Sequence, residues 1–188
     1  TATPIPRTLV LSYFGDMDIS ELREKPAGRQ PIDTRTIALS RVEEVEDAVG
    51  RAIAEGKRAY WVCPLVEESE KIDLAAAEER YAELRKRFGK SVDLVHGKMK
   101  GADKDAAMER FAAGQTQLLV ATTVIEVGVD VPEATIMVLE HAERFGLAQL
   151  LQLRGRFGRR SCQPTSQFIC ADAPRETANA PLAILGAA

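Results

Sequence analysis

Residues 118–132 read LLVATTVIEVGVDVP, an apolar segment that leads into a polar loop. The apolar part, residues 118–121, has the composition of a buried strand, whereas the loop carries hydroxyls, two acids and a glycine. In doubly wound α/β domains, ligands bind at the carboxyl ends of strands, where a crevice opens and backbone donors point outward. The pattern therefore predicts a binding loop at a strand end.

A second motif, QLRGRFGR, occupies residues 152–159. At helical spacing Arg156 and Arg159 project from one face, and the glycines at 155 and 158 permit the close approach of a backbone or a phosphate. Planar guanidinium groups bind phosphate oxygens bidentately and keep their charge near neutral pH. Two arginines alone are more often a solvated surface, but with Gln152 and both glycines they indicate a polyphosphate site.

Strand and helix patterns alternate through the rest of the chain. We expect strands at residues 35–39, 59–63, 92–95, 117–121, 135–140 and 166–171, and helices at 42–53, 74–88, 102–113 and 147–153. Ser40 and Glu43 predict a capping box for the first helix, and glycines at 56, 89 and 114 predict helix ends. The alternation implies an α/β fold: a doubly wound, mainly parallel sheet with helices on both faces. Residues 1–34 contain four prolines and are expected to be loop-like, which puts the folded domain at residues 35–188.

The composition is that of one ordinary globular domain, with 188 residues, 45% hydrophobic and 28% charged. No apolar run is long enough for a membrane span, and a net charge of -3 gives no overall basic surface for nucleic acid. Cys63, Cys162 and Cys170 lack C-x-x-C spacing, so we expect no metal site and a reducing cytoplasm, with Cys63 buried and inert. The chain begins at Thr1 without a visible leader, and we expect it to be a piece of a longer protein.

The chain offers arginines for a phosphate but no phosphate-binding loop of its own. The nearest match to G-x-x-x-x-G-K-[ST] is residues 50–58, which have five residues between the glycines and lie in a predicted helix. No aspartate is followed by a glutamate that would help to hold magnesium, and no G-x-G-x-x-G supports a dinucleotide enzyme. We therefore expect another domain to hold the nucleotide.

Residues 120–132 and 152–159 resemble motifs V and VI of the superfamily-two helicases. Four further stretches resemble the RecG family of ATP-dependent DNA helicases, which remodels stalled forks and branched DNA: TATPIPRT at 1–8, YWVCPL at 60–65, HGKM at 96–99 and ERFGLAQL at 143–150. The resemblance implies a RecA-like fold of the P-loop NTPase type, here the second motor domain preceded by a motif III stub. It also implies DNA and the first RecA-like domain as partners, ATP and Mg²⁺ held mainly by that first domain, and a cytoplasmic, nucleoid-associated location.

The same resemblance assigns roles on the nucleotide side. Arg159 is expected to be an arginine finger on the γ-phosphate, and Arg156 a second phosphate contact. Gln152 is expected to link to the attacking water and to the acids of the other domain. Gly128 and Asp130 are expected to lie beside the nucleotide ribose.

On the DNA side the resemblance implies phosphate contacts from Thr122, Thr123, His96 and Gly97, with Glu126 coupling the two sites. Simpler structural interpretations of these DNA-side residues stay open. The threonines suit an ordinary strand end, His96 suits a structural role, and Lys98 and Lys100 suit either a basic edge or a solvated loop. For Trp61, within an apolar strand, we expect a core position rather than a platform for base stacking.

The sequence departs from the family pattern in two places, and two alternative assignments stay open. The transcription-repair coupling factor has a similar motor, although residues 14–18, FGDMD, favour RecG. Phe157 and Arg160 replace an expected valine and glycine, and the chain stops at Ala188 before a segment that couples the motor to duplex translocation, so that coupling is expected to be incomplete. A RecA-like interaction module that has lost turnover is the other alternative, which the presence of the full motif set disfavours.

Overall fold

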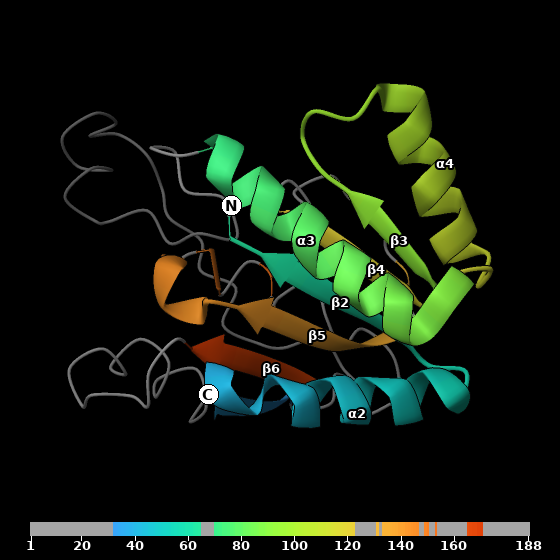
Figure 1. Ribbon diagram of the computed structural model, residues 1–188. Coiled ribbons are helices and arrows are strands. Elements are labelled where there is room, and N and C mark those ends of the chain that lie inside the picture. Colours follow the sequence, from blue (N-terminus) through green and yellow to red (C-terminus); the bar gives the residue numbers. More distant parts are fainter. Residues whose placement is uncertain are drawn as a thin grey trace, which may run out of the picture.

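The centre of the protein is a parallel β-sheet. The computed structural model describes residues 32–64, 70–122, 131, 133–146, 149–150, 153 and 165–170. Within these residues six strands pair in the order β1-β6-β5-β2-β4-β3, and every pair is parallel (Figure 1). The strands are β1 (Asp33–Ala38), β2 (Arg58–Cys63), β3 (Val92–Val95), β4 (Leu118–Thr122), β5 (Ala134–Glu140) and β6 (Thr165–Cys170). The predicted parallel sheet is confirmed, with each strand within two residues of its expected bounds.

Three α-helices connect the strands: α2 (Val42–Ala54), α3 (Glu70–Phe88) and α4 (Gly101–Ala112). Each is followed by one of the predicted glycines in the left-handed conformation, with φ of 80° at Gly56, 63° at Gly89 and 73° at Gly114. Residues 149, 150 and 153 are also helical, as expected. Helix α3 begins at Glu70, four residues before the predicted start at residue 74.

The capping box predicted for the first helix is wrong. A 3-10 turn, η1 (Leu39–Arg41), precedes α2, so Ser40 lies within helical backbone instead of the extended N-cap position. Arg41 occupies the N-cap without a side-chain capping bond, and its guanidinium binds the Glu44 carboxylate through two hydrogen bonds of 2.8 and 2.7 Å. An ion pair over the first turn has replaced the hydroxyl cap.

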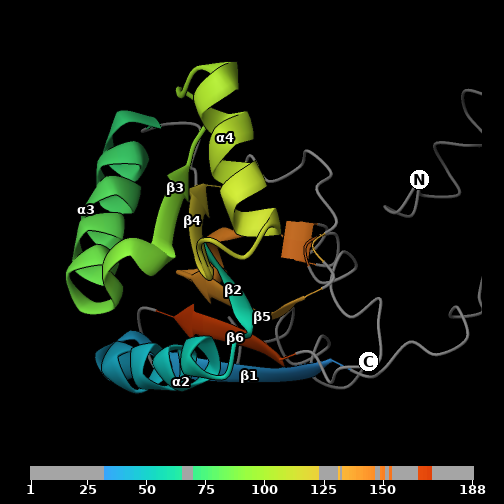
Figure 2. The ribbon, with the colours of Figure 1, turned by 90° about the vertical axis from the view of Figure 1, so that its right-hand side faces the viewer.

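Two hydrophobic clusters cover the two faces of the sheet, because successive strand residues point to opposite sides. Trp61 faces α2 and α3, where it packs with Val49 and Leu84. Tyr60 faces α4, where its ring lies 4.9 Å from that of Phe111. Figure 2 shows α2 and α3 on one side of the sheet and α4 on the other. The prediction of helices on both faces is confirmed.

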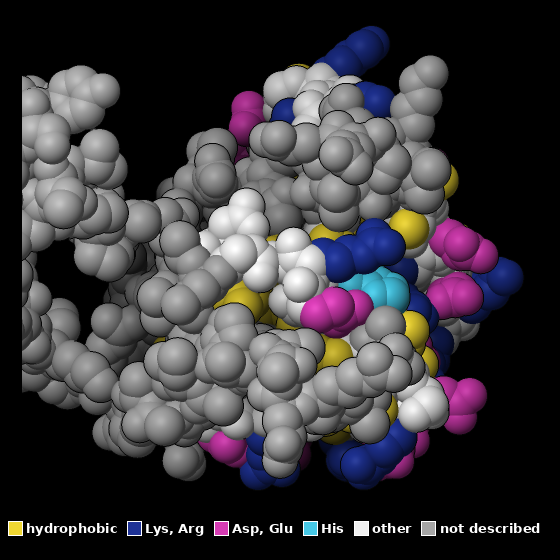
Figure 3. Space-filling model, turned by 90° about the vertical axis from the view of Figure 1, so that its left-hand side faces the viewer, with side chains coloured by type: hydrophobic (Ala, Val, Ile, Leu, Met, Phe, Trp, Pro, Cys, Tyr) yellow, Lys and Arg dark blue, Asp and Glu magenta, His cyan; other side chains and the backbone are white. Residues whose placement is uncertain are grey.

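The carboxyl ends of all six strands meet at one edge of the sheet. Cys63 at the end of β2 is in register with Thr122 at the end of β4, and Glu140 ends β5 on the other side of β2. Figure 3 looks onto this edge, where a histidine lies beside Lys or Arg and Asp or Glu side chains. The polar residues that end otherwise apolar strands are therefore brought together here.

The predicted boundary between residues 1–34 and 35–188 falls where the described part of the chain begins, and it stays a prediction. No helix in the described ranges is long and apolar enough to cross a membrane.

Candidate functional site

Thr122 is the last residue of β4 and lies at the carboxyl edge, between the ends of β2 and β3. This residue is 1% exposed, and its Oγ1 is buried without a hydrogen-bond partner among the described residues. An unsatisfied buried hydroxyl costs about 1 to 3 kcal/mol, so a ligand that accepts a hydrogen bond from it would stabilise this arrangement. The strand end that the sequence predicted is confirmed, and its hydroxyl has no partner in the described part of the chain.

His96 follows β3 at the same edge. Its side chain is 13% exposed, with Nε2 at 4.0 Å from Glu78 Oε1 on α3, while Nδ1 is buried and has no hydrogen-bond partner within the described ranges. The neighbouring Gly97 is exposed, and its carbonyl accepts a 2.8 Å hydrogen bond from Lys104 Nζ on α4. The imidazole is thus held near one acid with one ring nitrogen unpaired, and a lysine ammonium lies close to the glycine.

Seven predicted site residues lie outside the described part of the chain: Thr123, Glu126, Gly128, Asp130, Gln152, Arg156 and Arg159. Their immediate neighbours, however, are described. Val131 follows Asp130 and Leu153 follows Gln152, and both are buried in the cluster on the α4 face of the sheet. The end of the first motif and the start of the second, about twenty residues apart, are therefore anchored in the same hydrophobic cluster.

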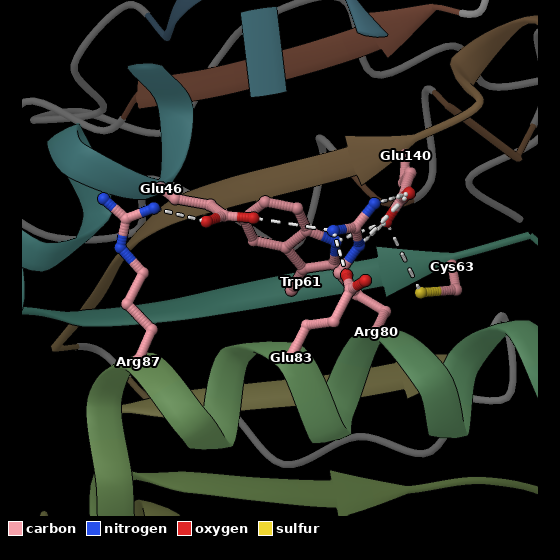
Figure 4. A network of polar contacts seen from close by, with 7 residues as sticks. All are labelled: Glu46, Trp61, Cys63, Arg80, Glu83, Arg87 and Glu140. Carbon is pink, nitrogen blue, oxygen red and sulfur yellow. Dashed lines mark hydrogen bonds and ion pairs between the residues drawn. The ribbon is translucent and has the colours of Figure 1, made fainter. Parts of the chain in front are cut away.

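Trp61 lies in the core, as expected, and not on a surface where bases stack. It is 0% exposed, and its Nε1 donates a 2.7 Å hydrogen bond to Glu140 Oε2 (Figure 4). Cys63 is buried as expected, and burial raises the pKa of its thiol far above its usual range, with the Glu140 carboxylate adding to the shift. The thiol therefore stays protonated, which agrees with an inert cysteine.

Glu140 is a buried acid at this edge that the sequence did not lead us to predict as a site residue. Its side chain is 9% exposed and binds the Arg80 guanidinium bidentately, with Nε donating to Oε2 at 2.9 Å and Nη2 to Oε1 at 2.7 Å. Burial alone would lower the pKa of Arg80, but the bonds and charge of Glu140, with Glu83 and Glu46, raise it above its ordinary value. One feature of the sequence could have identified Glu140: it is a polar residue at the end of an apolar run, ATIMVLE at 134–140. Thr122 also follows an apolar run.

No group of three or more His, Cys, Asp or Glu side chains that could hold a metal ion occurs among the described residues. The chemistry at the described edge is thus that of hydroxyl, imidazole and paired charged groups.

The fold and motifs define a class of protein. Residues 40–161 match the helicase conserved C-terminal domain, so the chain belongs to that family. Its parallel sheet between two helical layers is the RecA-like fold of such domains.

Particular relatives carry the name ATP-dependent DNA helicase RecG. The protein of that name from Synechocystis sp. is 50% identical over 165 residues, which are 87% of this chain and 20% of the relative. The Escherichia coli protein is 53% identical over 161 residues, 85% of this chain and 23% of the relative. A solved structure of RecG bound to a three-way DNA junction superposes with a TM-score of 0.80 and 40% identity, covering 98% of this chain and 24% of that one. The chain thus spans about a fifth to a quarter of the proteins it resembles.

Proposed function

We propose that this chain is the second RecA-like motor domain of a RecG-type ATP-dependent DNA helicase. The whole protein would remodel branched DNA, such as stalled forks and Holliday junctions, in recombination and repair in the cytoplasm, near the nucleoid. Identity of about half to RecG proteins supports this assignment over the coupling-factor alternative.

On the nucleotide side, ATP and Mg²⁺ would be held mainly by the first RecA-like domain. Arg159 would approach the γ-phosphate, Arg156 would add a second phosphate contact, and Gln152 would orient the attacking water. Gly128 and Asp130 would lie beside the ribose. An arginine finger neutralises charge that develops in the transition state, and is worth about 10³ to 10⁵ in turnover.

On the DNA side, Thr122, Thr123, His96 and Gly97 would contact backbone phosphates, and Glu126 would couple this site to ATP. Contacts to phosphate carry no sequence information, which suits a motor that moves on any DNA. Because Thr122 Oγ1 is buried, a phosphate would reach it only after the atoms that cover it shift. The unpaired Oγ1 and the unpaired His96 Nδ1, at the ends of neighbouring strands, support these contacts.

The observation that supports the proposal most is the shared burial of Val131 and Leu153 in the cluster on the α4 face. It anchors the end of the first motif and the start of the second in one cluster, which suits a site that joins nucleotide and DNA. A module that does not hydrolyse ATP would need neither both arginines nor the anchoring of the two motifs in one cluster.

Steady-state ATP hydrolysis tests the proposal. The longer protein that contains this chain is expected to hydrolyse ATP with Mg²⁺, faster when a three-way DNA junction is added, and to separate the arms of that junction. This chain alone is expected to do neither, because it lacks a phosphate-binding loop. If the longer protein fails to hydrolyse ATP under these conditions, the proposal is wrong and an interaction module is the better assignment.

A further inference from the structure

We propose that Arg80 is a positioning residue that holds the carboxyl end of β5, and through it the segment that leads to Gln152, Arg156 and Arg159. The inference rests on the proposed function, because those three side chains would act on ATP. Arg80 itself would touch neither ATP nor DNA.

The Arg80–Glu140 pair joins the middle of a helix to the end of a strand, 60 residues further along the chain. Both Glu140 oxygens accept from the Arg80 fork, and Oε2 also accepts from Trp61 (Figure 4). The Arg80 guanidinium lies 5.6 Å from the centre of the Trp61 ring, which adds a cation–π contact. The carboxylate is therefore held in two directions, by α3 and by β2.

Two further carboxylates, those of Glu83 and Glu46, also fix the position of the Arg80 side chain. Its Nη1 donates to Glu83 at 2.6 Å, one helical turn along α3, and lies 3.5 Å from Glu46 Oε1 on α2. Glu46 also accepts from Arg87 near the end of α3. The side chain of Arg80 is only 16% exposed, and a partly buried, multiply bonded pair is screened much less by solvent than a surface pair.

The backbone after Glu140 crosses to the other face of the sheet. His141 adopts a left-handed conformation with φ of 50°, and a 3-10 turn, η4 (Ala142–Arg144), follows. Ala142, Phe145 and Leu150 are then buried in the cluster on the α4 face, as is Leu153. The strand end is thus fixed by an ionic group on the α3 face and by apolar packing on the α4 face.

Loss of the Arg80 guanidinium would leave the Glu140 carboxylate with Trp61 and Cys63 as its donors among the described residues, and without a positive charge to balance its own. Leu153 adjoins Gln152 and lies six residues before Arg159, so a shift at Glu140 would pass through the buried residues Ala142, Phe145, Leu150 and Leu153 toward the motif. A displacement of about 1 Å in a group that acts on the transition state can cost up to a hundredfold in rate. Binding of ground-state ATP would change little, because another domain holds most of the nucleotide.

The test compares Arg80→Met with wild type in the longer protein, well below its unfolding temperature and with a saturating three-way DNA junction. We expect kcat for ATP hydrolysis to fall by roughly ten- to a hundredfold, with KM for ATP changed less than twofold. Arg80→Lys should be intermediate, because an ammonium cannot span both carboxylate oxygens. Hydrogen–deuterium exchange of the backbone amides of residues 141–153 should be faster in Arg80→Met.

Arg110→Met is the control for bidentate geometry, because Arg110 makes a more exposed pair with Asp93, at 2.9 Å for each bond, that joins α4 to β3 instead of α3 to β5. It should leave both kcat and the exchange of residues 141–153 at wild-type values. If Arg80→Met does not fold, Glu140→Gln removes the charge with little change of shape, and should give the same separation of kcat from KM.

The inference fails if kcat of Arg80→Met stays within twofold of wild type, if the loss appears in KM alone, or if Arg110→Met loses as much. If wild-type protein shows no ATP hydrolysis, the proposed function fails instead. The exchange experiment then still decides whether Arg80 holds residues 141–153, since unchanged exchange contradicts the inference on its own.

Discussion

Arg159 tests the proposed role in ATP hydrolysis most directly, because a domain without a phosphate-binding loop can use this arginine only on a phosphate held elsewhere. Arg159→Ala in the longer protein should lower kcat by roughly a thousandfold, or about 4 kcal/mol of barrier, and spare nucleotide affinity. Arg159→Lys should recover little activity, because an ammonium lacks the planar fork. The measurements are steady-state ATP hydrolysis with saturating branched DNA and nucleotide binding by titration.

Arg160→Ala is the neighbouring control, since it removes an adjacent positive charge that the resemblance assigns to no phosphate. It should change kcat by less than about tenfold, the scale of one ordinary electrostatic contact. A loss below tenfold for Arg159→Ala, or an equal loss of affinity, would make Arg159 a solvated surface residue.

Cys170 should make the stability of this chain depend on alkaline pH. Burial at the end of β6, and then the Glu143 carboxylate, raise the pKa of its thiol to about 11. Between pH about 9 and about 11 the folded state therefore keeps a proton that the unfolded state loses, so the free energy of unfolding should fall as pH rises through this range.

The check is urea unfolding under reducing conditions at a series of pH values, for wild type and Cys170→Ala. The variant should lose less stability than wild type across this range, because the contributions of Cys63 and of the lysines and tyrosines are common to both proteins. Parallel stability curves would contradict the shifted thiol.

The helix ends offer a matched comparison at the level of secondary structure. Gly56 and Gly114 both follow a helix with positive φ, but a Cβ at Gly56 would meet nothing within 4 Å, whereas one at Gly114 would lie 2.9 Å from Arg58 Nη2. Gly56→Ala should cost about 1 kcal/mol of stability for the left-handed conformation alone. Gly114→Ala should cost more, because Arg58 must move and its 2.9 Å bond to the Ala112 carbonyl is at risk.

Urea unfolding of the two variants measures the difference, and Arg58→Met provides the control. In the Arg58→Met background the extra cost of Gly114→Ala over Gly56→Ala should disappear. If both substitutions cost the same in the wild-type background, Arg58 yields without loss and the argument from the close contact fails.

Secondary-structure prediction succeeded where a local cause acts and failed where a neighbouring interaction competed. The helix ends at Gly56, Gly89 and Gly114 were predictable because an L-residue in a left-handed conformation is strained. The cap at Ser40 was not, because the chain enters α2 through a 3-10 turn and the Arg41–Glu44 pair covers the first turn. A capping motif alone does not exclude that alternative.

For the whole molecule, the balance of charge predicts weak binding of DNA by this chain alone. The net charge is -3, and the described part of the face in Figure 3 carries both signs of charge around a histidine. Neutral donors such as the Thr122 hydroxyl displace few counterions, and each neutralised phosphate contributes about 0.7 to 0.9 to the slope of log affinity against log salt. We expect a slope well below 5, measured by fluorescence anisotropy with labelled single-stranded and branched DNA at several salt concentrations.

A slope near 5 or above would mean that this chain presents a basic surface beyond the residues assigned here. Thr122→Val should lower affinity without changing the slope, since it removes a neutral hydrogen bond and keeps the shape of the side chain.

The order of strands and helices, the two helical layers and the buried positions of Trp61 and Cys63 followed from the sequence alone, because periodicity and glycine placement act over a few residues. The two motifs, and the resemblance that rests on them, were also recognisable in the sequence. Their roles at Arg156, Arg159 and Asp130 stay predictions. What the chain order could not reveal was which strand ends become neighbours: β6 lies between β1 and β5, and β2 between β5 and β4.

That arrangement placed Glu140 beside Trp61 and within reach of Arg80, and put Val131 and Leu153 in one cluster. A charged residue at the end of an apolar strand can either be exposed to solvent or pair with a buried partner, and the sequence does not distinguish the two. Only the packing of α3 over β4 and β2, which brings Arg80 to a residue 60 positions further along the chain, selects the buried pair.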